Sequence, residues 1–169
     1  RPLAIPPIPQ SMLPLGLIGL GPQWQCLYKP ALQRLRPRLG IHAVFTPIAS
    51  QALGCCQEWE CELRESLGSL VECQDAQAIV ILDSSWFGSV PLEFACRLGK
   101  PVLLADSPGA LTPELLDVAG LVEETCTTVV PDLLHRHSPA TTRLRELLAT
   151  RLGKPRAIEC DVQVGPTGR

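Results

Sequence analysis

The chain has 169 residues, enough for one globular domain but not comfortably for two. Its residues are 46% hydrophobic and 19% charged, so it can bury a real core, and wholesale disorder is excluded. The formal net charge is -2 and no basic block occurs, which excludes a nucleic-acid wrapper and a polybasic membrane binder. No uninterrupted apolar run reaches the roughly 18 residues of a spanning helix, and prolines break the apolar opening segment. We expect a cytoplasmic protein without nucleic acid or membrane among its partners.

Eight cysteines are spread along the chain, and none forms a CxxC pair. The tightest group, Cys55, Cys56 and Cys61, lacks a second pair or a nearby histidine, whereas structural zinc normally needs four ligands at close spacing. We therefore predict no metal site and interpret the cysteines as reduced, mostly buried small hydrophobes. A cysteine-based redox or metal sensor is the least favoured alternative.

The first part of the chain predicts a lead-in, a strand, a helix and a second strand. Residues 1–13 contain four prolines and no periodicity, which indicates an extended lead-in. Residues 15–19 are a short apolar run closed by glycine, typical of a buried strand. Apolar residues spaced by three and four over residues 24–35 predict one face of a helix, which Pro30 should kink or delay. The second strand is expected over residues 41–46.

The rest of the chain alternates between helical and strand patterns. The last predicted helix begins at a Ser138 cap and ends at Gly153, with a buried stripe of leucines between them. Strands that alternate with helices imply parallel βαβ units, so the predicted fold class is α/β, with a Rossmann-like, doubly wound, mostly parallel sheet flanked by helices over residues 14–153. Helices are expected over residues 48–59, 66–73, 90–98, 112–118 and 138–153, and strands over residues 78–82, 101–105 and 126–130.

The most informative segment is the turn that follows the first strand. Gly19 and Gly21 stand between an apolar run and a helix, where glycine lets the backbone approach a pyrophosphate and the helix N-terminus supplies N–H donors. The full fingerprint is GxGxxG, and Trp24 replaces its third glycine, so the helix must sit differently against the strand. The alternative is a tight βα turn that binds nothing.

The end of the second strand offers a further test of a dinucleotide site. An acidic residue there would bind the adenosine ribose 2′-hydroxyl, but Thr46 occupies that position. A hydroxyl can bond the ribose without repelling a 2′-phosphate. NADP is therefore not disfavoured relative to NAD.

The order of these elements resembles the N-terminal half of the glucose–fructose oxidoreductase, inositol dehydrogenase and MocA family. The matching motifs are the first glycine turn and the sequence ACRLGKPV at residues 95–102, which is similar to the family's A-x-x-x-GK-x-V. The resemblance covers about residues 14–164. It implies a Rossmann NAD(P) domain followed by an α+β domain, of which residues 154–169 would be only the first strand, a remnant.

The resemblance also implies a cofactor, a substrate class and site residues. The cofactor would be NAD or NADP, and the substrate a small polyol or sugar. The expected contacts are Gly19, Gly21, Pro22 and Gln23 at the pyrophosphate, Thr46 at the ribose, and Asp83, Ser84 and Trp86 on the nicotinamide side.

Two departures from the family count against independent catalysis. The family's Thr-Pro-Asn-type segment is replaced by residues 83–88, and its substrate-binding lysine is absent after the next strand. Asp106 follows that strand and is the weak candidate for a catalytic base; Asp83 and Asp106 either face one crevice or each cap a turn. The runner-up is a non-catalytic ligand- or protein-interaction domain that retains the fold. An unpaired strand over residues 156–164 predicts self-association.

The three histidines point to no site by sequence alone. His135 and His137 flank Arg136 before a predicted helix cap, and we interpret this segment as a solvated turn. His42 falls inside the second predicted strand, where a satisfied or edge-facing histidine is expected.

Overall fold

The computed structural model describes residues 12–105 and 113–157. By its contacts the chain divides into two compact units, Arg1–Asp132 and Leu133–Arg169. In the described part of the chain, no helix is long and apolar enough to cross a membrane.

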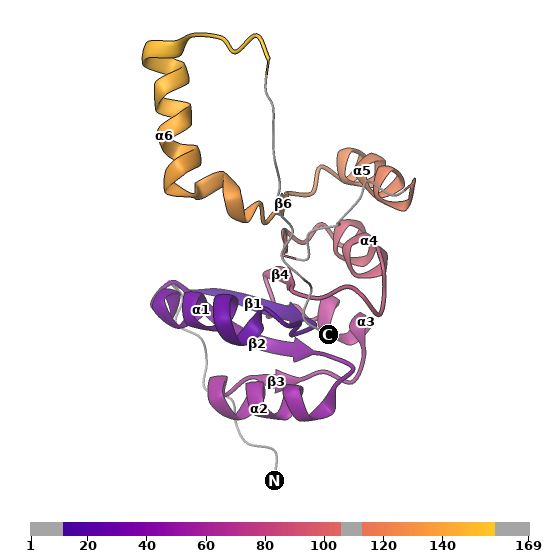
Figure 1. The fold of residues 1–169 in the computed structure, drawn as a ribbon. Helices are drawn as coiled ribbons and strands as arrows, with labels where there is room; N and C mark the ends of the chain where they lie inside the picture. The colour runs from indigo at the N-terminus through magenta and orange to yellow at the C-terminus, as the bar shows by residue number, and fades with distance from the viewer. Residues whose placement is uncertain (1–11, 106–112, 158–169) are drawn as a thin grey trace. The chain divides into compact units, whose positions relative to one another are not determined.

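The first unit is built on a six-stranded parallel sheet with the order β3-β2-β1-β4-β5-β6. The chain starts in the middle of the sheet, adds strands in one direction up to β3, and then crosses back to β4 on the other side of β1 (Figure 1). This reversal defines a doubly wound sheet and confirms the predicted Rossmann-like α/β class. The strands are β1 (Leu13–Ile18), β2 (Leu39–Phe45), β3 (Glu62–Leu63), β4 (Ala78–Ile81), β5 (Val102–Leu104) and β6 (Val129–Pro131).

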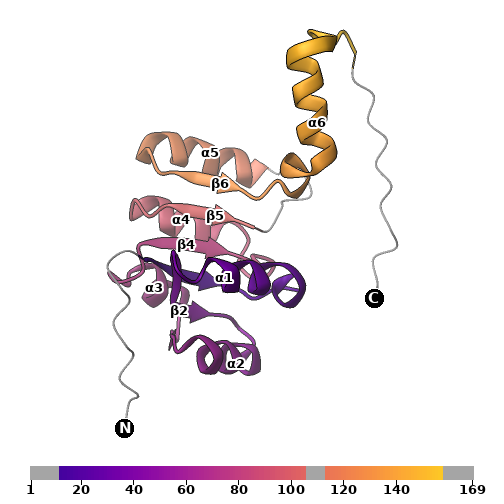
Figure 2. The same ribbon diagram turned by 90° about the vertical axis from the view of Figure 1, so that its left-hand side faces the viewer.

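Helices cover both faces of this sheet, as the two core clusters show. On one face the first helical segment and α2 pack on the sheet through Trp24, Leu32 and Cys55. On the other face α3, α4 and α5 contribute Leu70, Ala95 and further apolar side chains. Figure 2 shows the strands stacked between α2 at one end and α5 at the other. The helices are η1 (Trp24–Tyr28), α1 (Lys29–Leu35), α2 (Ala49–Trp59), α3 (Leu67–Val71), α4 (Val90–Arg97) and α5 (Pro113–Thr125).

The first helical segment accommodates Pro30 by a change in hydrogen bonding. Its first five residues, η1, form a π-helical turn, in which the Lys29 N–H donates to the Trp24 carbonyl five residues back. Pro30 follows in the first turn of α1. Since proline has no N–H to donate, it is tolerated where the wide turn gives way to α1. The predicted kink therefore takes the form of a widened turn at the start of the helix.

Several element boundaries differ from those predicted. The two-residue strand β3 was not predicted, because two residues are too few to show an alternating pattern. Helix α5 continues to Thr125, beyond the predicted end at residue 118. Strand β6 starts at Val129 and not at residue 126, because Cys126 has a φ of 52° and turns the chain there.

The second unit contains η2 (Leu134–His137), α6 (Pro139–Leu147) and the π-helical turn η3 (Leu148–Leu152). The predicted cap is confirmed: the Ser138 hydroxyl accepts a hydrogen bond from the Thr141 N–H, and Gly153 ends the helix with a φ of 69°. The predicted buried leucine stripe is wrong, since Leu144 and Leu152 are 51% and 63% exposed. In the described part of this unit, no residue of α6 or η3 is buried.

The cysteine prediction is confirmed in part. The described cysteines are all free thiols, and Cys55, Cys61, Cys73 and Cys96 are buried. Cys56 is half-buried, whereas Cys26 and Cys126 are exposed. Cys160 lies outside the described residues.

Candidate functional site

The carboxyl ends of three central strands meet at the turn after β1. The Gly19 N–H donates to the Phe45 carbonyl at the end of β2 (2.8 Å), and the Leu82 N–H after β4 donates to the Ile18 carbonyl (2.9 Å). In an open α/β sheet this edge, where the strand order reverses, is the usual place for a ligand. The turn at Gly19 is therefore the centre of the candidate site.

Gly19 and Gly21 are required at this turn by both conformation and space. Their φ angles are +67° and +27°, values that side chains of L-residues rarely adopt. A Cβ atom on Gly19 would stand 2.9 Å from the Cβ atom of Asp83, and one on Gly21 would stand 3.1 Å from the same atom. The prediction that these two glycines form the turn between the first strand and the first helix is confirmed.

The helix that follows begins directly after two exposed residues, Pro22 and Gln23. The Trp24 N–H donates to the Gly21 carbonyl (3.3 Å), and the Gln23 carbonyl accepts from the N–H groups of both Leu27 and Tyr28. The N-terminal end of the continuous stretch over residues 24–35 is thus anchored on the turn. Unpaired N–H groups and the positive end of the helix dipole favour an anion at such a position.

Trp24 occupies the place of the third glycine and is almost completely buried, with 6% exposure. Its ring centroid lies 6.5 Å from that of Trp59 on α2, with the planes tilted by 52°. A glycine there would let the helix pack closely on β1, whereas an indole needs room. The widened turn of η1 starts at Trp24, which agrees with the prediction that this helix sits differently against the strand.

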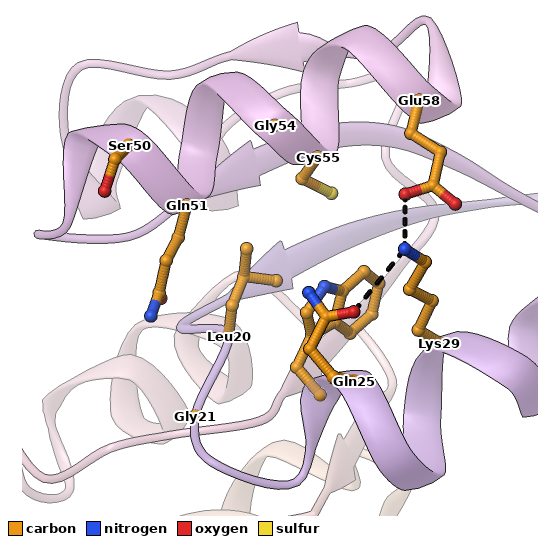
Figure 3. A pocket seen from close by; sticks show the side chains of 10 residues that line it. Leu20, Gly21, Gln25, Lys29, Ser50, Gln51, Gly54, Cys55 and Glu58 are labelled. Carbon is orange, nitrogen blue, oxygen red and sulfur yellow. Dashed lines mark hydrogen bonds and ion pairs between the residues drawn. The ribbon is translucent and has the colours of Figure 1, made fainter.

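A cavity of about 430 Å³ lies between this first helical segment and α2 (Figure 3). Lys29 Nζ is 2.7 Å from Glu58 Oε2 and links the two helices across one side of the cavity. Gly21, Trp24 and Cys55 were noted from the sequence, whereas the polar lining residues of α2 were not, although their place just after the second strand is a usable signal in a Rossmann-like pattern. The lining comprises Leu20, Gly21, Trp24, Gln25, Lys29, Ser50, Gln51, Gly54, Cys55 and Glu58.

The thiol of Cys55 in the cavity wall is coupled to that of Cys61. A hydrogen bond with the Cys61 thiol lowers the pKa of Cys55, and it outweighs the effect of burial, which would raise it. The same hydrogen bond, together with burial, raises the pKa of Cys61. Cys61 Sγ also lies 3.9 Å from Cys56 Sγ. The three thiols of the tightest sequence group are therefore close in space.

Thr46 lies at the end of β2, as predicted, next to the residue that accepts the Gly19 N–H. Its side chain is buried (8% exposed), and its hydroxyl oxygen accepts a hydrogen bond from the Ile48 N–H (3.4 Å). The hydroxyl thus shapes the turn that leads into α2. Its role at a ribose stays a prediction.

The residues after β4 form a tight turn beside the glycines. Asp83 Oδ1 accepts a hydrogen bond from the Ser85 N–H (3.0 Å), so this carboxylate caps the turn, as its structural alternative predicted. The Ser84 carbonyl accepts from the N–H groups of Phe87 and Gly88. Trp86 is 67% exposed, whereas Phe87 packs on Phe45 with ring centroids 5.6 Å apart.

The structure thus brings Gly19, Gly21 and Asp83 into contact and places Thr46 on the neighbouring strand end. Asp106 lies outside the described residues, so the shared crevice of two carboxylates stays a prediction.

Comparison with known proteins identifies similarity at the level of structure. No family model matches the chain. No curated protein matches it in a search. Among solved structures, an oxidoreductase from Thermotoga maritima matches with a TM-score of 0.72 and 25% identity, over 82% of this chain and 43% of that one. The scyllo-inositol dehydrogenase from Lactobacillus casei matches with a TM-score of 0.70 and 18% identity, over 83% of this chain and 42% of that one. The myo-inositol 2-dehydrogenase from Lactobacillus plantarum matches with a TM-score of 0.69 and 15% identity, over 82% of this chain and 41% of that one.

These matches confirm the resemblance stated from the sequence: the similar structures are oxidoreductases, and inositol dehydrogenases are among them. The fold is the Rossmann-like fold that these structures share. The chain spans less than half the length of each of the three.

Proposed function

We propose that the chain is the NAD(P)-binding domain of an oxidoreductase and that it has no independent catalysis. The pyrophosphate would contact Gly19, Gly21, Pro22 and Gln23, and the ribose would contact Thr46. Asp83, Ser84 and Trp86 would lie on the nicotinamide side. The bound dinucleotide would supply hydride transfer, while the protein binds and orients it.

The glycine turn is the observation that carries this proposal. Gly19 and Gly21 pack closely on Asp83 at positive φ, and so turn the chain from the end of β1 directly to the helix N-terminus at the exposed Pro22 and Gln23. A pyrophosphate binds where such a turn brings backbone N–H groups to a helix N-terminus. The residues at the turn therefore fit the phosphate groups of a dinucleotide.

The cavity supports the proposal on the side of Thr46. It extends from Gly21 to α2, the helix that follows Thr46, and Ser50 and Gln51 of α2 line it with polar side chains. Hydroxyl and amide groups are suitable partners for ribose hydroxyls. Lys29 brings a cation to the same wall, where it pairs with Glu58. With this lining, we expect the site to accept the 2′-phosphate of NADP.

The substrate class is a small polyol or sugar in this proposal. Two of the similar structures are inositol dehydrogenases. The chain covers about 40% of their length, so substrate positioning would require residues beyond those compared. Self-association, the cytoplasmic location and the limits of the predicted domains remain part of the proposal.

A titration with NADH and with NADPH tests dinucleotide binding. Calorimetry gives the affinity, and quenching of tryptophan fluorescence gives an optical signal, since Trp24 lines the cavity. Gly21→Ala should abolish binding, because a Cβ 3.1 Å from the Asp83 Cβ at a positive φ would displace the turn. Gly99→Ala is the matched control, since Gly99 also has a positive φ (+65°) but has open space around its Cβ position. Absence of binding by the folded unmodified chain, or equal binding by both variants, would refute the proposal.

The alternative is a non-catalytic interaction domain that retains the fold. Two tryptophans favour it: Trp24 departs from the glycine fingerprint, and Trp86 exposes 67% of its surface at the same sheet edge. Exposed aromatic side chains are typical of protein interfaces. A folded chain that binds neither dinucleotide and loses a protein partner on Trp86→Ala would establish this alternative.

A further inference from the structure

A β-bulge in strand β2 redirects the side chain of His42. Leu15 of β1 pairs with Ile41, and the next residue, Gly16, pairs with Ala43, so His42 is the extra residue without a counterpart in β1. Because of this extra residue, Ile41 and Ala43 join the core clusters on opposite faces of the sheet. Bulges commonly re-aim a side chain next to a functional site.

The redirected imidazole meets two residues of the loop between α3 and β4. Ligand atoms of His42, Cys73 and Asp75 all lie within 4.8 Å of one another. His42 Nε2 is 3.8 Å from Asp75 Oδ2, which is too far for a hydrogen bond. Lys100 fixes the loop, because its ammonium group donates to the carbonyls of Cys73 and Ala76.

The imidazole nitrogen in this group lacks a hydrogen-bond partner. Among the described residues, none accepts from or donates to His42 Nε2, although this atom is fully buried and the side chain is only 13% exposed. Buried polar atoms without a partner are uncommon and call for an explanation such as an ion. In its hydrogen bonds, His42 is therefore not the satisfied histidine expected from the sequence.

We propose that His42 Nε2, Cys73 Sγ and an Asp75 carboxylate oxygen bind one Zn²⁺ ion. Imidazole nitrogen, thiolate sulfur and carboxylate oxygen are the three donor types that zinc takes, at about 2.0–2.3 Å. Donor atoms around a tetrahedral ion at those distances are separated by about 3.3–3.8 Å. A nitrogen and an oxygen donor fall at the short end of this range, so the 3.8 Å between His42 Nε2 and Asp75 Oδ2 would shorten by a few tenths of an ångström on binding. Cys73 is buried and Asp75 is exposed, which leaves the fourth position on the solvent side for water.

Arg64 provides the outer hydrogen bond to the thiolate. Its Nη2 lies 3.1 Å from Cys73 Sγ, and its guanidinium also pairs with Glu62. The negative charges of Cys73 and Asp75 would offset the two positive charges of Zn²⁺, Arg64 pairs with Glu62, and the Lys100 ammonium is held by backbone carbonyls. Outer hydrogen bonds of this kind orient a ligand and tune its affinity for the metal.

The same three residues do not fit a nucleophilic triad. A Cys-His-Asp triad uses one ring nitrogen for the nucleophile and the other for the carboxylate. Here Nε2 lies 3.8 Å from the carboxylate, beyond hydrogen-bond distance, so Asp75 does not hold the ring as the carboxylate of a triad would. The buried thiol also has no access to a substrate.

The position of the site indicates a structural ion. Residues 73–77 precede β4, so the site lies at the amino end of that strand. The glycine turn follows the carboxyl end of β1, which is parallel to β4, and is therefore at the opposite edge of the sheet. An ion there would tie β2 to the loop before β4, and its binding free energy would add to folding stability.

The experiment compares metal binding by the full chain and by two variants, each of which neutralises one exposed carboxylate. Zn²⁺ affinity is measured by competition with a chromophoric chelator after the protein is stripped of metal, and Co²⁺ is used as a spectroscopic probe. The unmodified chain should bind one equivalent of Zn²⁺ and gain thermal stability. Asp75→Asn should weaken Zn²⁺ binding by roughly 100-fold or more, since changes to outer partners alone cost about 10–100-fold. Glu72→Gln removes the same charge from a neighbouring exposed residue and should leave the affinity unchanged.

The thiolate ligand is tested with Cys73→Ser. Bound Co²⁺ should give a thiolate charge-transfer band in the unmodified chain and in Glu72→Gln, and this band should be lost in Cys73→Ser. A folded Cys73→Ser chain that keeps the band, as it would if the Cys55–Cys61 group held the ion, overturns the proposal. If Cys73→Ser does not fold, the affinities decide: equal Zn²⁺ binding by Asp75→Asn and Glu72→Gln overturns it. Failure of the unmodified chain to bind Zn²⁺ also overturns it.

Discussion

Gly19 packs so closely against Asp83 that a Cβ atom on the glycine would stand 2.9 Å from the Cβ atom of the aspartate. This contact joins the turn after β1 to the turn after β4, two segments separated by more than sixty residues in the sequence. The glycine conformation and the tight packing act together, because the φ of +67° aims the missing side chain at the Asp83 backbone. The edge of the sheet at the candidate site depends on this pair.

The first prediction is that Gly19→Ala destabilises the fold more than Gly99→Ala. Both glycines have a φ near +65°, so each alanine would cost about 1–2 kcal/mol of backbone strain. At Gly19 the clash with Asp83 adds about 1–3 kcal/mol of overpacking, whereas the space at Gly99 is open. Urea denaturation of the two variants measures the difference. Equal losses of unfolding free energy would mean that the contact with Asp83 relaxes without cost.

The second prediction contrasts two tryptophans that differ in burial. Trp24→Ala should lower the free energy of unfolding by about 3–5 kcal/mol, because it empties a core position that is 6% exposed. Trp86→Ala should change it by less than about 0.5 kcal/mol, because Trp86 is 67% exposed. Chemical denaturation monitored by far-UV circular dichroism measures both variants. Tryptophan fluorescence is unsuitable, since each substitution removes a fluorophore. A large loss at Trp86 would show that this side chain packs on the fold.

The alternation of apolar runs and helical spacing was enough to predict most of the sheet. The run over residues 78–82 predicted β4 because a buried central strand is apolar on both faces. The bulge at His42 could not be predicted, because it depends on the pairing of β2 with β1 and leaves no mark in the periodicity of either strand. His42, Cys73 and Asp75 lie in a strand and a distant loop, so their proximity is a property of the fold alone.

The candidate site, too, could be predicted from the sequence only in part. Glycines that require positive φ are visible in a sequence, and Gly19 and Gly21 were predicted as the turn from their place between a strand and a helix. The cavity wall on α2, with Ser50 and Gln51, was not predicted, because it arises where two helices separated by β2 approach each other. The π-helical start at Trp24 was also missed, since only the size of the side chain hinted that the helix must adjust.

The third prediction concerns the choice between NAD and NADP. Thr46 carries no charge, so the unmodified chain should bind NADPH no worse than NADH. Thr46→Asp should weaken NADPH binding more than NADH binding, because a carboxylate repels the 2′-phosphate, and the difference should shrink as salt is added. Thr46→Ser, which keeps a hydroxyl acceptor for the Ile48 N–H, is the control. A strong preference of the unmodified chain for NADH would contradict the assignment of Thr46.

The fourth prediction is that the chain alone shows no appreciable dehydrogenase activity with sugars, polyols or their keto forms. Hydride transfer at a carbon that bears a hydroxyl needs a group within hydrogen-bond reach of that oxygen to move the proton. The resembling family supplies a lysine after the strand that corresponds to β5, and this chain has Asp106 and Ser107 there. Positioning and orientation of the substrate are worth roughly 7–11 kcal/mol of the barrier.

The assay follows NAD(P)H absorbance with each compound of the panel, after calorimetry has established that the dinucleotide binds. Under the proposal the absorbance stays constant for the unmodified chain and for Asp106→Asn alike. Turnover by the unmodified chain that vanishes in a folded, dinucleotide-binding Asp106→Asn variant would contradict the proposal. Asp106 would then be the base that accepts the hydroxyl proton, and the chain would be an enzyme in its own right, since a carboxylate placed beside the nicotinamide can perform that step without the family's lysine.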